Sequence, residues 1–351
     1  MTASLRPPAS SPLDLTCWVV TDGRVGIEIQ AAGLARSIGL DPEIKRLKAS
    51  APWRWLPPRF WLDPLAHLAP DSDRLAPPWP DVLVGCGRMA VAASSAVRRA
   101  AGGNTFTVQI QDPKLPLQRF DVVVAPRHDG LAGRNVIATL GSMHGMSEAQ
   151  LAEAASSFAP RYEQLPRPRI GVLIGGNSRT HRLTAGNART LAARLKAWSS
   201  ELGAGLIVTP SRRTGTATLS ILREALAGCP VEIWDRSGEN PYRGMLALSD
   251  AFVVTADSVN MACEAAFTGK PIFVAPVAGG TPKFSRFHKS LREAGIARPL
   301  DAPFESWHYA PLRETERVAA EIRRRIAAWR GEPEPAGQAE PRGVDLQRHA
   351  G

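Results

Sequence analysis

Short apolar runs alternate along the chain with polar, glycine-containing loops and with stretches of helical periodicity. The first run, residues 15–20, gives way to a loop and then to a helical pattern over 27–38. Runs over 81–84, 105–110 and 120–125 continue this order. Short runs rich in β-branched residues predict strands, and strands that alternate with helices predict a parallel sheet covered by helices on both faces.

The same architecture begins again after a Leu-Pro-Arg-Pro stretch at 165–168, which has the composition of an interdomain linker. At 351 residues the chain is long enough for two α/β domains, each with its own core. We therefore predict two doubly wound, Rossmann-like domains that face a cleft. The expected division is 14–164 for the first domain, 165–310 for the second, 311–330 for a C-terminal helix and 331–351 for a disordered tail.

Residues 253–271 predict a strand, a tight turn, a helix and a stop. Asp257 or Ser258 can cap the start of the helix. Helical spacing puts Asp257, Asn260 and Glu264 on one polar face. Free N–H groups and the helix dipole suit a phosphate there, and a carboxylate about two turns into the helix can accept hydrogen bonds from a ribose diol.

Polar loops follow the predicted strands of the first half. Parallel strands place all their following loops on one rim, where such sheets bind substrates. The loops lack the GxGxxG spacing of dinucleotide-binding proteins, and glycine-built turns with solvated neighbours are an equally open interpretation. The candidate ligand-binding residues of this half are Gly23, Arg24, Gly85, Gly87, Arg88 and Gln111, and the candidate bases are Asp22, Asp112 and His128.

The loops of the second half combine glycines, hydroxyls and arginines. The loop after the strand at 170–174 offers backbone N–H groups for a phosphate cradle, but it lacks the GK[ST] end of a P-loop. Basic side chains in this loop and the next can balance a diphosphate's charge. The candidate residues are Gly175, Gly176, Asn177, Ser178, Arg179, Ser211, Arg212 and Arg213.

Residues 45–80 interrupt the alternating pattern with many prolines, several aromatic residues and interleaved basic residues. Such a segment can lie on an anionic membrane surface or recognise a lipid-linked acceptor. The plainer interpretation is that its tryptophans fasten an irregular insertion to the domain. The residues expected to contact a membrane are Trp53, Trp55 and Trp61.

The net charge of +10 comes mostly from arginine, which favours a phosphate-bearing partner, although arginine richness can also reflect genome composition. The arginines are scattered and no nucleic-acid-binding motif is present, so no nucleic-acid partner is expected. The four cysteines lie far apart and suit reduced, buried thiols. No apolar run has the length of a membrane span and the first residues lack a targeting pattern, so we expect a cytoplasmic protein that can be peripheral at the inner face of a membrane.

Five motifs resemble those of the family of the plant mitochondrial-fission factor "elongated mitochondria" and its bacterial relatives. The resemblance covers roughly residues 15 to 330. For plant members it implies a docking role in fission, and it leaves open any chemistry of the bacterial members. The motifs are at residues 21–24, 109–113, 174–178, 211–214 and 255–261.

More distantly, the order of elements resembles GT-B glycosyltransferases, particularly the peptidoglycan N-acetylglucosaminyl transferase. That resemblance implies that loop 175–178 follows the first strand of the donor domain, that Ser258 lies in a diphosphate-binding turn and that Glu264 binds ribose. It matches residues 85–87 and 111–112 to acceptor-domain loops. It also implies transfer without metal or cofactor, because helix dipoles and basic side chains neutralise the leaving diphosphate.

Two positions depart from the GT-B pattern. Asp257 brings a negative charge where a small neutral residue usually faces the diphosphate, and Arg24 stands where a histidine base is expected. A base then comes from Asp22, the first choice, from Asp112 or His128, or transfer has been lost. The leading hypothesis is a protein that binds a UDP- or GDP-linked sugar in the cleft and transfers it to an unknown envelope or lipid-linked acceptor. The alternative is a non-catalytic scaffold with the same fold.

Overall fold

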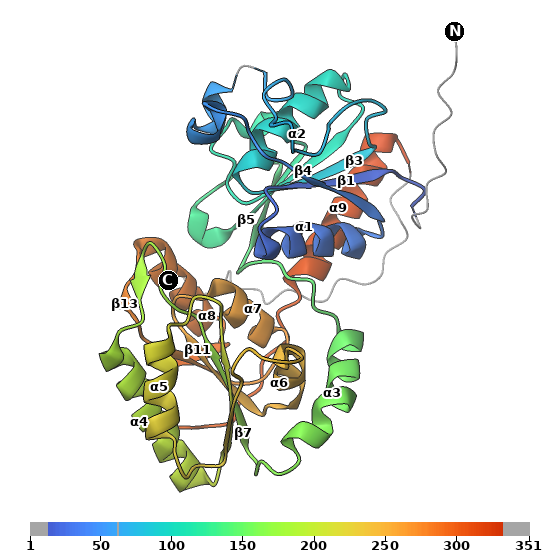
Figure 1. Cartoon of the computed structure of the whole chain (residues 1–351). Coiled ribbons are helices and arrows are strands. Elements are labelled where there is room, and N and C mark those ends of the chain that lie inside the picture. Colours follow the sequence, from blue (N-terminus) through green and yellow to red (C-terminus); the bar gives the residue numbers. More distant parts are fainter. Residues whose placement is uncertain (1–12, 62, 333–351) are drawn as a thin grey trace, which may run out of the picture.

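The computed structural model of the chain describes residues 13–61 and 63–332 and contains two parallel six-stranded sheets, one in each half of the chain (Figure 1). The strand order of the first sheet is β2-β1-β3-β4-β5-β6. Both sheets are parallel throughout, as the alternating pattern predicts. The elements of the first half are β1 Cys17–Thr21, α1 Val25–Ile38, β2 Pro42–Arg46, β3 Val82–Cys86, α2 Arg88–Ala100, β4 Phe106–Ile110, β5 Val122–Pro126 and β6 Val136–Thr139, with 3₁₀ turns at Trp53–Trp55, Pro58–Phe60, Leu117–Arg119 and Arg127–Asp129.

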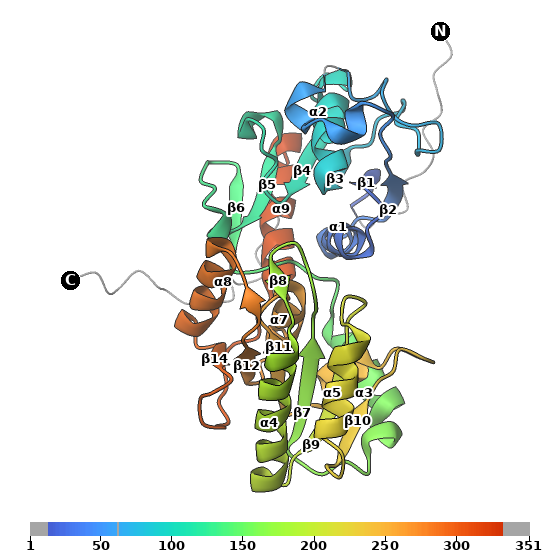
Figure 2. The ribbon, with the colours of Figure 1, turned by 60° about the vertical axis from the view of Figure 1, so that its left-hand side comes forward.

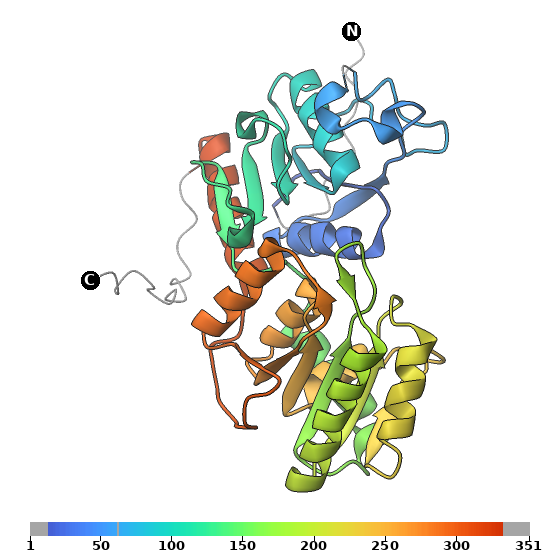
Figure 3. The ribbon, with the colours of Figure 1, turned by 90° about the vertical axis from the view of Figure 1, so that its left-hand side faces the viewer.

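The second sheet has the order β10-β9-β7-β11-β12-β14 and a separate two-stranded hairpin, β8 with β13. Its central strands, apart from Arg169 at the start of β7, are buried because helices cover both faces of the sheet (Figure 3). The predicted class, two doubly wound α/β domains of the GT-B type, is confirmed. The elements are α3 Glu148–Tyr162, β7 Arg169–Ile174, β8 His181–Arg182, α4 Ala185–Leu202, β9 Gly205–Pro210, α5 Thr216–Ala225, β10 Val231–Ile233, α6 Tyr242–Leu248, β11 Ala251–Thr255, α7 Val259–Ala266, β12 Ile272–Ala275, β13 Ala278–Gly279, α8 Pro282–Glu293, β14 Ala297–Pro299 and α9 Glu314–Arg330.

Two helices show how the chain divides between the domains. The last helix, α9, returns to the first domain, where Val318 and Ile322 are buried in the same core as β1 and β3 (Figure 2). The helix α3, like β7 that follows it, packs in the second domain, where Phe158 and Tyr162 are part of the core. The domain division at 164/165 remains a proposal, and the packing of α3 favours a boundary before residue 148. The expected tail at 331–351 lies, from residue 333 onward, outside the described residues.

The chain crosses between the domains twice, and the two crossings are bonded to each other. The backbone N–H of Leu140 donates to Glu314 Oε2 at 3.1 Å. Between His144 and Thr315, the His144 N–H donates to Oγ1 at 3.1 Å while that hydroxyl donates back to the His144 carbonyl at 2.9 Å. The crossings therefore form one junction between the two domains.

Candidate functional site

Two neighbouring side chains, Ser258 and Asp257, stabilise the turn after β11 in different ways. Ser258 is the N-cap of α7, since its Oγ accepts the Met261 N–H at 3.4 Å. Asp257 does not cap this helix. Its Oδ1 accepts the Thr255 hydroxyl at 2.7 Å, and its Oδ2 accepts the Gly176 N–H at 2.9 Å. The carboxylate therefore ties β11 to the loop after β7.

Arg213 completes the environment of Asp257, with its Nη2 2.9 Å from Oδ2. The Asp257 side chain is fully buried, and a Cβ on Gly175 would overlap its carboxylate. The expected repulsion between this aspartate and a diphosphate is thus reduced, because an arginine and a backbone dipole already compensate its charge. Only glycine fits at position 175, for packing rather than for ligand approach.

The loop at 175–178 was predicted to be a phosphate cradle, but its backbone donors are engaged within the protein. The Gly175 N–H donates to Thr255 Oγ1 at 2.8 Å, and the Asn177 N–H donates to the Arg213 carbonyl at 3.3 Å. The Ser178 N–H donates to the His181 carbonyl at 3.0 Å. In this conformation the loop offers side chains to a ligand rather than a ring of free N–H groups.

The loop after β9 is likewise hydrogen-bonded to the loop after β7. Ser211 Oγ donates to the Gly175 carbonyl at 2.7 Å, and the Thr214 hydroxyl also donates to that carbonyl. Arg179 and Arg212 remain exposed on this edge of the sheet. The structure therefore brings the loops after β7, β9 and β11 together, as predicted from their positions after parallel strands.

Glu264 lies partly exposed on α7, and the Tyr242 hydroxyl at the start of α6 donates to its Oε2. Burial raises the pKa of Glu264 to about 7, while the bond from Tyr242 lowers it in part. The Tyr242 hydroxyl binds only Oε2 of Glu264, so Oε1 is suited to accept a hydrogen bond from a ligand hydroxyl. Sequence reasoning did not pair these residues, since 22 positions separate them.

The first domain meets this edge through α1. The Gln30 side chain, buried on α1, donates from Nε2 to Asn260 Oδ1 at 3.4 Å. A Cβ on Gly26 would lie 3.7 Å from the Asn260 amide nitrogen. Asn260 therefore faces the opposite domain, and the starts of α1 and α7 lie together where the two domains meet.

The loop after β1 holds the first-choice base in an ion pair. Arg24 Nε lies 3.0 and 2.9 Å from the two oxygens of Asp22, and Arg24 Nη2 lies 2.6 Å from Oδ2. The same bond raises the pKa of Arg24. Gly23 and Gly87 have positive φ, and a Cβ on Gly87 would lie 3.3 Å from Asp22. Asp22 thus lies at the meeting point of the loops after β1 and β3, next to a guanidinium.

The other first-domain candidates have mixed roles. A Cβ on Gly85 would overlap Ser94 and Gln109 side-chain oxygens, so this glycine serves packing inside the domain. Arg88 donates from Nη2 to the Leu56 carbonyl at 2.5 Å. Asp112 pairs with Lys114, and Gln111 is exposed with a φ of 71°.

His128 lies in the contact between the domains. Its ring is buried edge-on against Phe287 of α8, with ring centroids 5.5 Å apart, and its carbonyl accepts Arg286 Nη2 at 2.9 Å. Asp129 pairs with Lys283 at 2.6 Å. Burial lowers the pKa of His128. His128 is thus a packed residue of the interface between the domains, although its ring Nδ1 has no hydrogen-bond partner.

The three tryptophans proposed for membrane contact differ in placement. Trp61 is 7% exposed, and its Nε1 donates to the Leu56 carbonyl at 3.0 Å. Trp53 stacks on His67, with ring centroids 4.1 Å apart. Trp55 alone of the three is strongly exposed, at 63%. Two of the three rings are therefore engaged in contacts within the segment itself.

Within residues 13–61 and 63–332, no group of three or more histidine, cysteine or acidic side chains lies close enough to hold a metal ion. The helices of that same part of the chain include none that is both long and apolar enough to cross a membrane.

Residues 25–326 match the model of a family described as mitochondrial fission ELM1. A curated relative, the mitochondrial fission protein ELM1 of Arabidopsis thaliana, is 36% identical over 276 residues, which are 71% of this chain. The match spans 64% of the plant protein's own length.

Solved structures share the fold at low identity. A UDP-N-acetylglucosamine 2-epimerase superposes with a TM-score of 0.51 and 12% identity, covering 93% of this chain and 99% of the epimerase. The S. aureus MnaA structure determined with UDP has a TM-score of 0.50 and 12% identity, covering 92% of this chain and all of that chain (100%). At this identity the likeness concerns the fold alone.

Proposed function

This chain belongs to the mitochondrial fission ELM1 family, and we propose that it binds a nucleoside diphosphate sugar in the cleft between its domains. The observation that carries the proposal is the placement of Glu264, a partly exposed carboxylate held by the Tyr242 hydroxyl on the same edge as the capped start of α7. UDP is bound in the MnaA structure, which has the same fold. A UDP- or GDP-linked sugar is the ligand class that fits.

In this proposal the nucleotide lies over the second sheet's carboxyl edge. Ionised Glu264 accepts hydrogen bonds from the ribose hydroxyls. The diphosphate lies at the start of α7, where the helix dipole favours negative charge, near Ser258 and Asn260. The exposed guanidiniums of Arg179 and Arg212 supply positive charge from the neighbouring loops.

We further propose that the protein transfers the sugar without a metal ion to an unknown acceptor, envelope-derived or lipid-linked, at the inner face of a membrane. Asp22 would accept the proton of the acceptor hydroxyl as the new glycosidic bond forms and the nucleoside diphosphate leaves. For this step the Asp22 carboxylate must exchange part of its ion pair with Arg24 for the acceptor. Arg24 would then be available to the developing negative charge.

A second candidate function is a non-catalytic scaffold that keeps this fold as a docking surface. The internal bonds of the 175–178 loop favour it, because N–H groups that bind the protein are unavailable to a phosphate. The ion pair at Asp22 and the burial of His128 favour it too. The two functions make opposite predictions for nucleotide binding.

The test is thermal unfolding of the full chain with UDP, GDP and their sugars, repeated for Glu264→Gln. A ligand at roughly 100 times its dissociation constant stabilises the fold by about 2.7 kcal/mol. We expect one nucleotide to raise the melting temperature of the wild type, with most of the rise lost in the variant. Glu201→Gln, a change of the same kind at an exposed position on α4, is the matched control and should keep the rise.

The absence of a shift with every nucleotide would reject the donor site and favour the scaffold. An equal shift in wild type and Glu264→Gln would reject Glu264 as the ribose ligand. Where a nucleotide binds, hydrolysis or transfer of its sugar by wild type, compared with Asp22→Asn, separates an enzyme from a binding protein.

A further inference from the structure

Two 3₁₀ turns, Trp53–Trp55 and Pro58–Phe60, project the most exposed aromatic rings of the first domain. Trp55 is 63% exposed and Phe60 is 51% exposed. The turns themselves are anchored, since buried Trp61 binds the Leu56 carbonyl and Arg88 binds that same carbonyl from α2. The fold therefore holds two large apolar side chains in water instead of burying them.

Each exposed ring is paired with the arginine before it. The Arg54 guanidinium lies 4.3 Å from the Trp55 ring centroid, and that of Arg59 lies 4.7 Å from the Phe60 centroid. Each pair places a positive charge over the face of an exposed apolar ring. Aromatic rings with adjacent basic groups suit the boundary between lipid headgroups and acyl chains, where the ring is half-buried and the cation meets phosphate.

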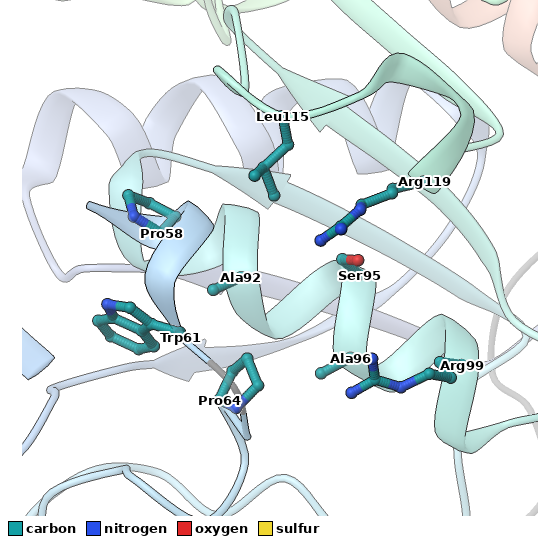
Figure 4. A pocket seen from close by; sticks show the side chains of 9 residues that line it. All are labelled: Pro58, Trp61, Pro64, Ala92, Ser95, Ala96, Arg99, Leu115 and Arg119. Carbon is teal, nitrogen blue, oxygen red and sulfur yellow. The ribbon is translucent and has the colours of Figure 1, made fainter. Parts of the chain in front are cut away.

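A shallow hollow beside these turns covers about 260 Å³ of space, part of which is open solvent. Figure 4 shows Pro58 and Trp61 on one side of it, with Arg99 of α2 and Arg119 of the 117–119 turn on the other. Both arginines are exposed, and the Arg119 guanidinium points toward Ser95. Two guanidiniums and a hydroxyl around an open hollow match the charge and donors that a phosphate group needs.

The surrounding charge is mostly positive, although the exposed carboxylate of Asp63 lies in the chain between Trp61 and Pro64. Residues 50–61 contain two arginines and no carboxylate, and α2 contains three arginines and no carboxylate. The nearby carboxylate of Asp121 is already paired with Arg98, Oδ1 to Nη2 2.8 Å. The surface made by Arg54, Trp55, Arg59, Phe60, Arg99 and Arg119, here named the aromatic-arginine surface, is therefore basic as well as apolar.

The aromatic-arginine surface lies at the outer edge of the first domain, away from the second sheet (Figures 1 and 3). A large flat partner can cover it without closing the cleft. We propose that this surface docks the protein on an anionic phospholipid membrane, with Trp55 and Phe60 at the headgroup boundary and a lipid phosphate between Arg99 and Arg119. This role goes beyond the proposed nucleotide site, and neither depends on the other.

The experiment is co-sedimentation of the full chain with vesicles of phosphatidylcholine alone and of phosphatidylcholine with phosphatidylglycerol. We expect binding to the anionic vesicles only, and its loss at high salt. Arg99→Gln with Arg119→Gln should lower the partition coefficient roughly 30-fold, from the usual contribution of a basic residue near an anionic surface. Trp55→Ser with Phe60→Ser should lower it by about tenfold or more.

The matched control is Arg189→Gln with Lys196→Gln, which removes the same two charges from exposed positions on α4. It should bind the vesicles nearly as wild type. An equal loss in this control would show a net-charge effect and overturn the proposal, as would equal binding to both kinds of vesicle or none by wild type. Self-association that disappears in Trp55→Ser with Phe60→Ser, measured by light scattering, would assign the surface to a second copy instead. Nucleotide-induced stabilisation should be the same in all these variants.

Discussion

Asp257 and Arg213 form an ion pair, Oδ2 to Nη2 2.9 Å, that joins the loops after β11 and β9 at the edge of the second sheet. The Asp257 side chain is fully buried, whereas that of Arg213 is 42% exposed. The pair is therefore asymmetric. If Asp257 is removed, water can take its place as a partner of Arg213. The buried groups that donate to Asp257 would have no such replacement.

Asp257→Ala should destabilise the protein by about 3 kcal/mol, because it leaves the Gly176 N–H and the Thr255 hydroxyl without an acceptor. Arg213→Gln should cost about 1 kcal/mol, because its side chain is already partly solvated. Urea unfolding of both variants and the wild type measures the two values. A loss below about 0.5 kcal/mol for Asp257→Ala would contradict a stabilising role for this carboxylate.

The raised pKa of Glu264 predicts that nucleotide affinity depends on pH. The group is ionised above about 7, and only the carboxylate accepts two ribose hydrogen bonds, so affinity should increase between about pH 6 and pH 8. Stability without ligand should change in the opposite sense. The folded protein holds this proton more tightly than the unfolded chain, so the stabilisation is complete below the unfolded pKa and is lost as pH rises through about 7. Titration calorimetry and urea unfolding across this range, with Glu264→Gln as the variant without this titration, test both statements.

Tyr242→Phe should weaken nucleotide binding at neutral pH without abolishing it. The Tyr242 hydroxyl donates to Glu264, and this bond favours the ionised carboxylate, so its removal raises the pKa of Glu264 further. The variant should regain near wild-type affinity at a pH well above the new pKa. A loss of affinity that is the same at every pH would instead indicate direct contact between Tyr242 and the ligand.

His144 predicts acid sensitivity at the junction between the domains. Burial lowers its pKa to about 4, and its Nδ1 accepts the Met146 N–H at 3.3 Å. Since the unfolded chain binds the proton more readily, this contribution is present above the ordinary histidine pKa and is lost as pH falls from about 6.5 toward 4, by about 3 kcal/mol in total. His144→Asn keeps an acceptor and should flatten the dependence of unfolding free energy on pH in that window. An unchanged slope would place the acid sensitivity at other histidines.

Gly141→Ala should destabilise the protein by about 2 kcal/mol or more, since a methyl group there overlaps Cys263 Sγ and lies 3.2 Å from Phe287. Gly186→Ala, in the first turn of α4, meets only Thr184 Oγ1 at 3.6 Å and should be neutral or stabilising. Thermal unfolding of the two variants compares them directly. Equal melting temperatures would mean that the segment around Gly141 can shift away from α7 without a loss of stability.

Much of the fold could be predicted from local patterns. The buried strands are short β-branched runs, and the start of α7 is marked by Ser258, which the structure uses as the cap. Local patterns do not reach the features that packing over long sequence distances decides. Periodicity along α3 cannot tell which sheet its apolar face will cover, and Phe158 packs in the second domain.

The candidate site shows the same limit. Ser211, Asp257 and the 175–178 loop each follow a parallel strand, and this was enough to predict that they lie at one edge of the sheet. It could not reveal that the donors of Gly176 and Asn177 bind within the protein, because their acceptors lie on other loops. It also gave no reason to separate Trp55, which is exposed, from Trp61, which is buried.

The sequence by itself determined the two parallel sheets, the order of strand, loop and helix, and the rim on which the polar loops gather, because each depends on periodicity and on turn residues close in the chain. Only the tertiary structure decided that Arg213 neutralises Asp257, that Tyr242 orients Glu264 and that Gln30 meets Asn260. These contacts join residues 22 to 230 positions apart. Which side chains meet at such separations is set by the packing of whole elements, which no local pattern contains.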